Sequence, residues 1–267
     1  MAVLKRLVKA GVGSVIGLIL PDTCRAGGDG DVAMGLSTGV REAIARLSGQ
    51  NFCFHCGLTT GPYEAHDARH PCGRCGERDV GVARVARVGT FSEPLIALVH
   101  QLKFGRGSGR GSWELARLLA PFVYQAMMRV AEAGKISVDV MVPVPLHWSR
   151  SARRGFNQAD ELAREVARLS GWKVYGALTR VRRTQAQALM DYRAQRMENL
   201  RGAFVLRSGA EKQLAGGHVW LIDDVTTTGA TLHAAATALR KTAKGQRAAS
   251  INAAVVCVTD HRSPEAE

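Results

Sequence analysis

The sequence lacks the phosphate-binding loop of nucleoside triphosphatases. That loop requires a glycine five positions before a Gly-Lys pair, and a Ser or Thr directly after the pair. Gly134-Lys135 is followed by Ile136, and Arg129 occupies the position of the first glycine. The sequence therefore excludes this class of nucleotide-binding enzyme.

Long hydrophobic runs are also absent. Three basic residues precede an apolar stretch at residues 10–20, which is too short to span a bilayer. Pro21-Asp22 follows in place of the small residues of a signal-peptide cleavage site. We expect a cytoplasmic protein without a transmembrane segment. Its N-terminal segment is predicted to be an amphipathic helix that packs on the protein or on a partner, with peripheral contact to a membrane surface as the alternative.

Aromatic residues are few, at 6% of the chain. Proteins that bind single-stranded nucleic acid stack its bases on aromatic side chains, and Trp148 and Phe156 are the obvious candidates here. Acidic residues are in the minority, which gives a net charge of +13. Residues 147–201 alone contain twelve Lys or Arg against five Asp or Glu. This balance indicates anionic partners such as phosphates or nucleic acid, although charge alone is weak support for a nucleic-acid role.

Six cysteines are present, and four of them form two Cys-x-x-Cys pairs separated by fifteen residues: Cys53, Cys56, Cys72 and Cys75. Two such pairs provide four thiolates for a tetrahedral zinc site. Disulfides are the alternative, and they are disfavoured because nothing else in the sequence indicates secretion. Four cysteine ligands leave no open coordination position. We therefore expect a structural zinc ion in a small ribbon.

The most informative segment runs from His218 to Thr231. The apolar residues 219–222 predict a buried parallel strand. Asp223 and Asp224 follow at its carboxyl end, where open α/β sheets bind their ligands. A loop of small residues comes next, before an alanine-rich helical stretch. The members of this loop are Thr226, Thr227, Thr228, Gly229, Ala230 and Thr231.

Together, the loop and the two acids predict a sugar-phosphate site. The backbone N–H groups and hydroxyls of the loop, at a helix N-terminus, suit a phosphate. Gly229 would permit its close approach. The carboxylates can accept hydrogen bonds from vicinal sugar hydroxyls, or hold a phosphate-bound Mg²⁺ through water. The alternative is a core strand with a solvated acidic turn, but it does not explain why acids, threonines and glycine occur in this order.

Basic residues elsewhere are candidates for the rest of such a ligand. Residues 138–145 predict the first strand of the domain, closed by two prolines. Arginines in the loop after it could bind pyrophosphate oxygens in pairs. Lys103 heads a basic glycine-rich loop, in a suitable place for a phosphate. The pyrophosphate-side candidates are Lys103, Arg150, Arg153 and Arg154.

An arginine-rich stretch follows residue 180. It is either an ordinary solvated helix or a mobile lid that closes over the substrate and excludes water from the reaction. The lid candidates are Arg182, Arg183, Thr184, Gln187 and Arg196.

The segment Asp223 to Gly229 resembles the 5-phosphoribosyl-1-pyrophosphate (PRPP) motif of type I phosphoribosyltransferases. Over about residues 50–260, the order of further motifs resembles the ComF family, which couples a zinc ribbon to a phosphoribosyltransferase-like domain. These motifs are Leu102-Lys-Phe-Gly105, Val142-Pro-Val-Pro-Leu146, Arg154-Gly-Phe-Asn-Gln158, Arg183-Thr184 with Gln187, Arg196 with Asn199, and Phe204. The resemblance implies an α/β fold with a mostly parallel sheet flanked by helices.

The chain departs from these patterns at three positions. Only Cys24 remains of an additional N-terminal knuckle that family members often carry, so a second metal site is not expected. Trp148 replaces a usual proline. Thr227 stands where purine-salvage relatives have an acidic base, so no general base can be named.

The resemblance implies that PRPP and Mg²⁺ bind with the ribose at Asp223 and Asp224 and the 5-phosphate on residues 226–231. In the implied reaction a nucleophile displaces pyrophosphate from ribose C1 through an oxocarbenium-like transition state. The family includes proteins of bacterial competence, DNA uptake and the use of DNA as a nutrient. The alternative function is a non-catalytic protein that binds PRPP or single-stranded DNA and assists DNA-uptake proteins.

Length and composition, 267 residues of which 46% are hydrophobic, suit one sizeable core with a small appendage. We predict an N-terminal helix and connecting segment at 1–49, the zinc ribbon at 50–80, the phosphoribosyltransferase-like domain at 81–260 and a tail at 261–267. Loss of zinc is expected to unfold the ribbon and spare the larger domain. Within that domain, helices are predicted at 90–103, 113–130 and 158–169, and strands at 172–178 and 250–259. Cys257, in the last strand, is expected to be a buried core thiol.

Overall fold

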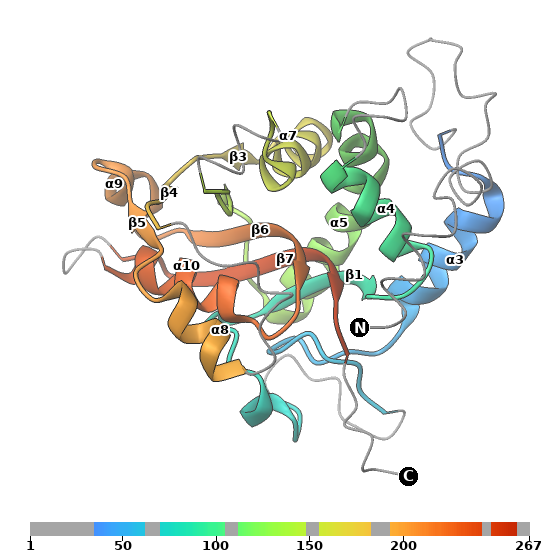
Figure 1. Ribbon diagram of the computed structural model, residues 1–267, viewed down its shortest axis with the longest axis horizontal. Helices are drawn as coiled ribbons and strands as arrows, with labels where there is room; N and C mark the ends of the chain where they lie inside the picture. Colours follow the sequence, from blue (N-terminus) through green and yellow to red (C-terminus); the bar gives the residue numbers. More distant parts are fainter. Residues whose placement is uncertain are drawn as a thin grey trace.

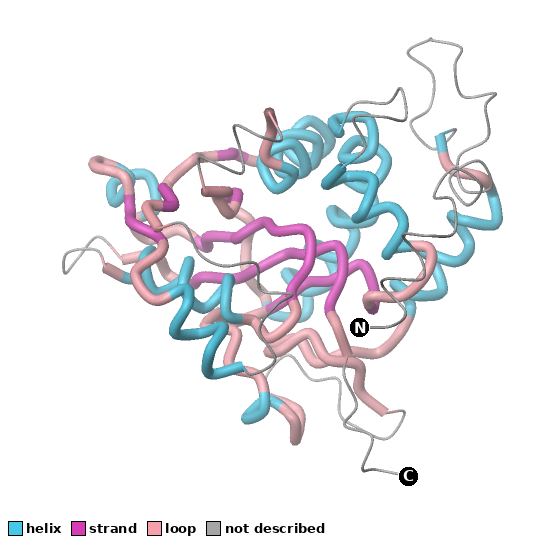
Figure 2. The backbone as a smooth tube through the Cα atoms, in the orientation of Figure 1, coloured by secondary structure: helices cyan, strands magenta, loops and turns pink. Residues whose placement is uncertain are grey.

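A computed structural model describes residues 35–61, 70–104, 112–147, 155–182, 193–241 and 247–260. Its central element is a five-stranded parallel sheet of order β1-β7-β6-β2-β3. The strands are β1 Val85–Thr90, β2 Val140–Pro143, β3 Lys173–Val174, β6 His218–Thr226 and β7 Ser250–Val258. Helices cover both faces, so the domain has three layers (Figures 1 and 2). The predicted α/β fold with a parallel sheet is confirmed.

Side chains of the central strands alternate between two cores, because successive strand residues point to opposite faces of a sheet. In β6, Trp220 and Ile222 pack into one hydrophobic cluster, and Val219 and Leu221 pack into the other. All four side chains are fully buried. Burial on both faces explains why this strand reads as a continuous apolar run.

Four helices bury their apolar sides in the first core: α3 Thr38–Gly49, α4 Leu95–Phe104, α5 Ser112–Gly134 and α7 Gln158–Ser170. The sequence of α7 shows why such a helix begins and ends where it does. The side chain of Asn157 accepts a hydrogen bond from the N–H of Ala159 at 3.3 Å and caps the N-terminus. Gly171, in the left-handed conformation, ends the helix.

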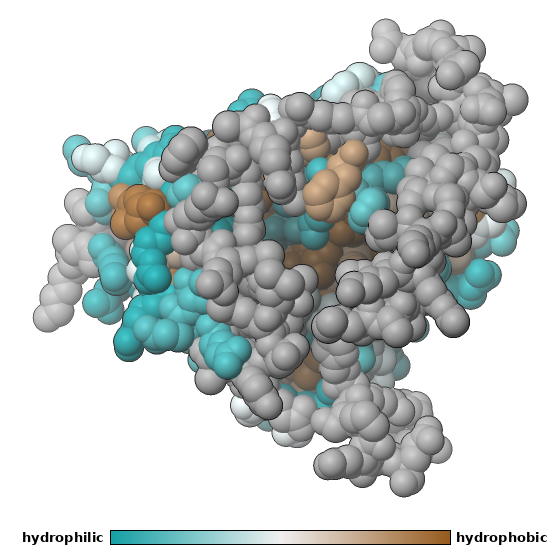
Figure 3. Space-filling view, viewed as in Figure 1, coloured by the Kyte–Doolittle hydropathy of each residue, from teal (hydrophilic) through white to brown (hydrophobic). Residues whose placement is uncertain are grey.

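The opposite face of the sheet is covered by α10 (Ala230–Arg240) and α8 (Arg193–Leu200) (Figure 1). A small antiparallel pair, β4 (Leu178–Arg180) with β5 (Phe204–Leu206), and the short helix α9 (Ala210–Leu214) add to this side. Leu178, Phe204 and Leu214 all join the second core. Hydrophilic residues gather on the outer surface around α8 and α10 (Figure 3).

Most predicted elements match the structure. The strands predicted at 138–145 and 250–259 correspond to β2 and β7, and the three predicted helices correspond to α4, α5 and α7. The strand predicted at 172–178 is divided, because β3 ends at Val174 and β4 begins at Leu178. Strand β6 extends beyond residues 219–222, since Asp223 and Thr226 continue the pairing with β7. Cys257 is fully buried, as expected.

The buried apolar residues described in the ribbon belong to the two cores of the sheet. Phe52 and Phe54 belong to the first core of the large domain. Cys53, Cys56 and Leu58 belong to the second. The ribbon and the large domain thus share buried surface, and the expectation that the large domain survives loss of zinc stays a prediction.

The first knuckle, residues 53–58, packs closely against the sheet. Gly57 has a φ of 78°, and a Cβ atom at this position would lie 3.0 Å from Cγ1 of Val85 and 3.2 Å from Cγ2 of Val258. From β1, the buried guanidinium of Arg87 donates to the carbonyl of Gly57 and to the hydroxyl of Thr59, both at 2.8 Å. Burial lowers the pKa of Arg87 to about 10. The strand thus supplies a cation that holds the knuckle.

The predicted helix near residues 10–20 lies outside the described residues, as does Cys24. Within residues 1–49, the structure describes α3. In the described parts of the chain, no helix combines the length and the apolar character that a membrane span requires.

Candidate functional site

The four thiols of the two knuckles meet at one point. All four Sγ atoms lie within 4.8 Å of one another. The separation is 3.5 Å for Cys53 and Cys75, and 3.7 Å for both Cys56–Cys72 and Cys72–Cys75. Four sulfurs bound tetrahedrally to zinc would lie about 3.8 Å apart, given Zn–S bonds of about 2.3 Å. The predicted ligands therefore converge in a cluster that fits a zinc ion.

The electrostatics of this cluster also favour a metal. The thiol of Cys56 and backbone N–H groups, including those of His55 and Cys72 at 3.4 Å, lower the pKa of Cys53 by hydrogen bonding to its sulfur. Burial raises the pKa of Cys75 to about 12, and the hydrogen bond with Cys53 raises that of Cys56. The thiolate of Cys53 thus forms readily, and its negative charge opposes the ionisation of Cys56 and Cys75. A bound dication would remove this opposition, because it attracts all four charges.

Asp223 and Asp224 lie near the carboxyl end of β6, between the parallel strands β2 and β7. Asp224 is buried and Asp223 is half-buried. Oδ1 of Asp223 accepts a hydrogen bond from the N–H of Asp224, and Oδ1 of Asp224 accepts one from the N–H of Val225, both at 2.9 Å. These local bonds fix the orientation of both carboxylates.

Lys103, in the last turn of α4, reaches the acid pair. Its Nζ lies 2.7 Å from Oδ2 of Asp224, and the two side chains are 26% and 6% exposed. This ion pair is largely shielded from water, which strengthens it relative to a surface pair. The structure thus places Lys103 in contact with one of the two acids that we predict to bind the ribose. Its contact with pyrophosphate stays a prediction.

The two acids differ in how easily they ionise. Burial raises the pKa of Asp223 well above its ordinary range, the adjacent Asp224 raises it further, and Lys103 offsets only part of this effect. Carboxyl groups with strongly shifted pKa values cluster at functional sites, because a charge positioned for a ligand costs free energy when the ligand is absent.

Replacing Asp223 with Asn is expected to stabilise the protein at neutral pH. Ionising Asp223 costs free energy only in the folded state, about 1.4 kcal/mol for each unit by which its pKa exceeds the unfolded value. The cost is absent below the unfolded pKa of about 3.9 and grows as the pH rises through the folded pKa. Thermal unfolding from pH 4 to 8 should show a variant melting about 2–4 °C higher per kcal/mol at pH 7.

At pH 4 the two proteins should melt together, and this convergence is the internal control. Asn keeps the oxygen that accepts the Asp224 N–H, so the local hydrogen bond persists. Equal melting temperatures at every pH would contradict the prediction.

The predicted phosphate loop, residues 226–231, joins β6 to α10. Gly229 has a φ of 83° and is the N-cap residue of α10. Thr227, Thr228 and Thr231 are partly exposed, and the hydroxyl of Thr228 accepts a hydrogen bond from the N–H of Ala230 at 3.4 Å. Thr226 is buried. Three partly exposed threonines thus lie beside the N-terminus of α10.

The other predicted residues are only partly visible. Arg150, Arg153, Arg154, Arg183, Thr184 and Gln187, together with Trp148, lie outside the described residues, and so does the side chain of Arg196 in α8. The guanidinium of Arg182 donates to the carbonyl of Arg201 at 2.6 Å. Arg201 directly follows α8. This bond therefore connects the residues on either side of segment 183–200, which contains the other lid candidates. The lid itself stays a prediction.

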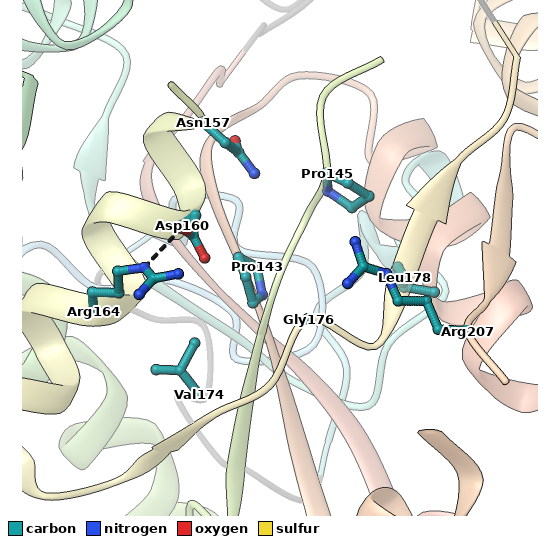
Figure 4. A pocket seen from close by; sticks show the side chains of 9 residues that line it. All are labelled: Pro143, Pro145, Asn157, Asp160, Arg164, Val174, Gly176, Leu178 and Arg207. Atoms are coloured by element: carbon teal, nitrogen blue, oxygen red, sulfur yellow. Dashed lines mark hydrogen bonds and ion pairs between the residues drawn. The ribbon is translucent and has the colours of Figure 1, made fainter. Parts of the chain in front are cut away.

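A cavity of about 420 Å³ lies beside the edge strand β3 (Figure 4). The start of α7 forms one wall, where Asp160 pairs with Arg164 at 2.8 Å, and Arg207 lies on the opposite side. The described residues that line it are Pro143, Pro145, Asn157, Asp160, Arg164, Val174, Gly176, Leu178 and Arg207. None of the predicted PRPP residues that the structure describes is among them. This cavity is distinct from the acid pair and its loop.

Arg78, which lies three residues after Cys75, is a further residue of the site that has no counterpart among the predicted ones. Arg78 is 5% exposed, and its guanidinium donates to the carbonyl of Thr226 at 2.9 Å. A lone arginine next to a knuckle gives no local signal of such a role. Its partner is 148 positions away in the sequence, so only the fold brings them together.

Curated proteins resemble this chain over most of its length. The DNA utilization protein YhgH of Salmonella typhi is 37% identical over 199 residues, which cover 73% of this chain and 81% of that protein. YhgH of Escherichia coli (strain K12) is 37% identical over 190 residues, with coverage of 70% and 77%. Competence protein F of Haemophilus influenzae is 30% identical over 209 residues, with coverage of 78% and 85%. No family model matches the sequence, and no solved structure matches it.

Proposed function

Because this chain belongs to the ComF family, together with the DNA utilization protein YhgH and competence protein F, we propose that it is a PRPP-binding phosphoribosyltransferase that serves DNA uptake or the use of DNA as a nutrient. One observation carries the ligand assignment. The acid pair Asp223–Asp224, in which the buried Asp224 contacts Lys103, leads directly into the phosphate loop. Acids and an anion site in this arrangement suit a phosphorylated sugar.

In the proposed reaction, residues 226–231 hold the 5-phosphate and the acid pair accepts hydrogen bonds from the ribose hydroxyls. A nitrogen nucleophile forms a bond to ribose C1 while the bond from C1 to the pyrophosphate oxygen breaks. The electron pair leaves with pyrophosphate, and the nitrogen releases its proton to solvent. The carboxylates favour the positive charge that develops on the ribose. Arg150, Arg153 and Arg154 receive the leaving group. Mg²⁺, when bound with PRPP, neutralises phosphate charge, and carboxylate oxygens are donors that suit it.

The cysteine cluster supports a cytoplasmic site of action. Four thiolates must stay reduced to bind zinc, and the cytoplasm maintains reduced thiols. We therefore place the protein in that compartment, with zinc as a structural ion.

A second candidate function is binding of single-stranded DNA. Phe104 at the end of α4 is 52% exposed, and Trp113 at the start of α5 is 48% exposed. Both flank the basic glycine-rich stretch 105–111 and follow Lys103. Exposed aromatic rings next to positive charge suit stacked bases of a nucleic-acid strand. Phe156, a predicted stacking residue, is half-buried.

One experiment tests the proposed function and separates it from the second. Purified protein with Mg²⁺ is expected to release pyrophosphate from PRPP when supplied with a suitable nitrogen nucleophile from a panel of bases and amines. Changing Arg150, Arg153 and Arg154 to Ala should lower PRPP affinity or turnover about 10- to 100-fold, because the charge-assisted bonds to pyrophosphate can no longer form. Calorimetry and a pyrophosphate assay give the two readouts.

The same triple variant is then titrated with single-stranded DNA at several salt concentrations. A DNA-binding accessory protein should bind all sequences more weakly by about the same factor. Its salt slope should fall by roughly 0.7 for each DNA phosphate that the variant no longer neutralises. Mutual competition between PRPP and DNA would show that both activities share this surface. Failure of the wild-type protein to bind PRPP would overturn the proposed transferase.

A further inference from the structure

The segment that leaves the second knuckle lies against the phosphate loop. The knuckle ends in a short 3₁₀ turn, Cys75–Glu77, and the N–H of Arg78 donates to the carbonyl of Cys75 at 3.1 Å. Arg78 therefore starts from a position that a metal ligand fixes. Its side chain is 5% exposed, which is rare for an arginine without a specific set of acceptors.

The guanidinium of Arg78 joins the carboxyl ends of two strands. It donates to the carbonyl of Thr226 at 2.9 Å and to the carbonyl of Thr259 at 3.2 Å. The hydroxyl of Thr226 lies 3.5 Å from the same guanidinium. Thr226 ends β6 and opens the phosphate loop, and Thr259 directly follows β7. A planar cation with several donors suits this task, because it binds both carbonyls at once.

The next residues pack against the loop and the helix behind it. At Gly229, a Cβ atom would lie 2.7 Å from Cγ1 of Val80 and 3.4 Å from the carbonyl oxygen of Asp79. The carboxylate of Asp79 lies 3.2 Å from Nδ1 of His233 in the first turn of α10. The close approach to Val80, together with its positive φ, requires glycine at position 229. Because Gly229 has no side chain, the ribbon as well as a phosphate can approach the loop closely.

At its far end, this segment is held by α10. Gly81 has a φ of 66°, and its carbonyl accepts a hydrogen bond from Arg240 at 2.6 Å. The chain from residue 78 to residue 81 is therefore in contact with the loop at one end and with the last turn of α10 at the other.

We propose that Arg78 is a positioning residue through which the zinc ribbon holds the phosphate loop in its binding conformation. Metal binding fixes Cys75, and Cys75 fixes the backbone of Arg78. Arg78 in turn fixes the carbonyls of Thr226, at the start of the loop, and of Thr259, after β7. A preformed loop binds a phosphate more tightly than a loose one, since the ordering cost is met before the ligand arrives. The ribbon then has a role in ligand affinity besides stability. The part of the inference that concerns affinity rests on the proposed PRPP site.

The test compares Arg78→Ala with wild type by hydrogen exchange and by calorimetry. Amide exchange at residues 226–231 should accelerate, because Thr226 loses its guanidinium partner. Affinity for PRPP, and for ribose 5-phosphate as a probe of the loop alone, should fall about tenfold or more. Zinc content, measured by metal analysis, should stay at the wild-type level. Arg78→Lys should recover only part of the affinity, since one ammonium cannot reproduce the planar contact to two carbonyls.

The matched control is Arg74→Ala. Arg74 lies on the same knuckle but pairs with Asp260 at 3.4 Å, so its loss should leave loop exchange and ligand affinity near wild type. Removing zinc from the wild type with a chelator should accelerate exchange at 226–231 as well. In Arg78→Ala the same treatment should accelerate exchange at these residues by a smaller factor than in the wild type, because one of the connections between ribbon and loop is already broken.

The outcomes are distinguishable. Unchanged exchange at 226–231 in Arg78→Ala, or an undiminished effect of zinc removal in that variant, would overturn the positioning role. A wild-type protein that binds neither PRPP nor ribose 5-phosphate would overturn the proposed function instead. Hydrogen exchange would still decide whether the ribbon holds the loop.

Discussion

Replacing Asp223 and Asp224 together with Asn is expected to abolish PRPP binding while the fold survives. The two carboxylates are the only anionic acceptors that we assign to the ribose, and Asp224 also holds Lys103 at 2.7 Å. Asn keeps the side-chain shape but loses the charge that attracts hydroxyl protons or Mg²⁺. We expect affinity to fall at least about 100-fold, equivalent to about 2.7 kcal/mol. Calorimetry with PRPP and Mg²⁺ measures this loss directly.

A control with the same change in charge is Glu161→Gln with Glu165→Gln. Both residues lie on α7, outside the predicted PRPP residues. This control should bind PRPP like wild type, and circular dichroism should show folded protein in both double variants. Undiminished affinity in the Asp variant would remove the acid pair from the binding site.

Loss of the metal is expected to destabilise the whole domain and not the ribbon alone. In structural zinc sites the free energy of metal binding is free energy of folding. Because Cys53, Cys56 and Leu58 belong to the second core, a disordered first knuckle would uncover side chains on β1 and β7. Cys56→Ser should abolish zinc binding and cost at least about 3 kcal/mol, a fall of roughly 6–12 °C in melting temperature. Metal analysis and calorimetric melting give the readouts.

Cys257→Ala provides the comparison. It removes another fully buried thiol, but one that is outside the cluster. This variant should keep its zinc and lose less stability than Cys56→Ser. A Cys56→Ser protein that melts like wild type would show that the large domain tolerates an unmetallated ribbon after all.

The elements that the sequence predicted well are those with a strong local pattern. Strand β6 follows from a continuous apolar run, and its two acids mark the carboxyl end of the strand. Helix α7 follows from its apolar spacing, with a cap residue at Asn157. The clustering of the four candidate metal ligands follows from their spacing alone. In each case the information lies within a few turns or a few residues of the chain.

The remaining features depend on contacts between distant segments. Lys103 pairs with Asp224 because α4 ends at the same edge of the sheet as β6, and no local pattern encodes that meeting. Arg78 reads as an ordinary surface charge until the fold brings Thr226 to it. The ribbon was predicted as a separate unit because its four cysteines lie within one short segment, yet Phe52 and Phe54 belong to a core built mostly from later segments.

The pairing of β1 has a consequence for the order in which the protein is made. In the central sheet β1 pairs with β7, which begins at residue 250, and Gly57 rests on Val258 of the same strand. Domains emerge from the ribosome N-terminus first, at about 5–20 residues per second. The first knuckle and β1 therefore leave the ribosome before β7, the strand against which both of them pack, has been synthesised. The ribbon can therefore pack in its final position on the sheet only after synthesis of β7, as one of the last parts of the molecule to be completed.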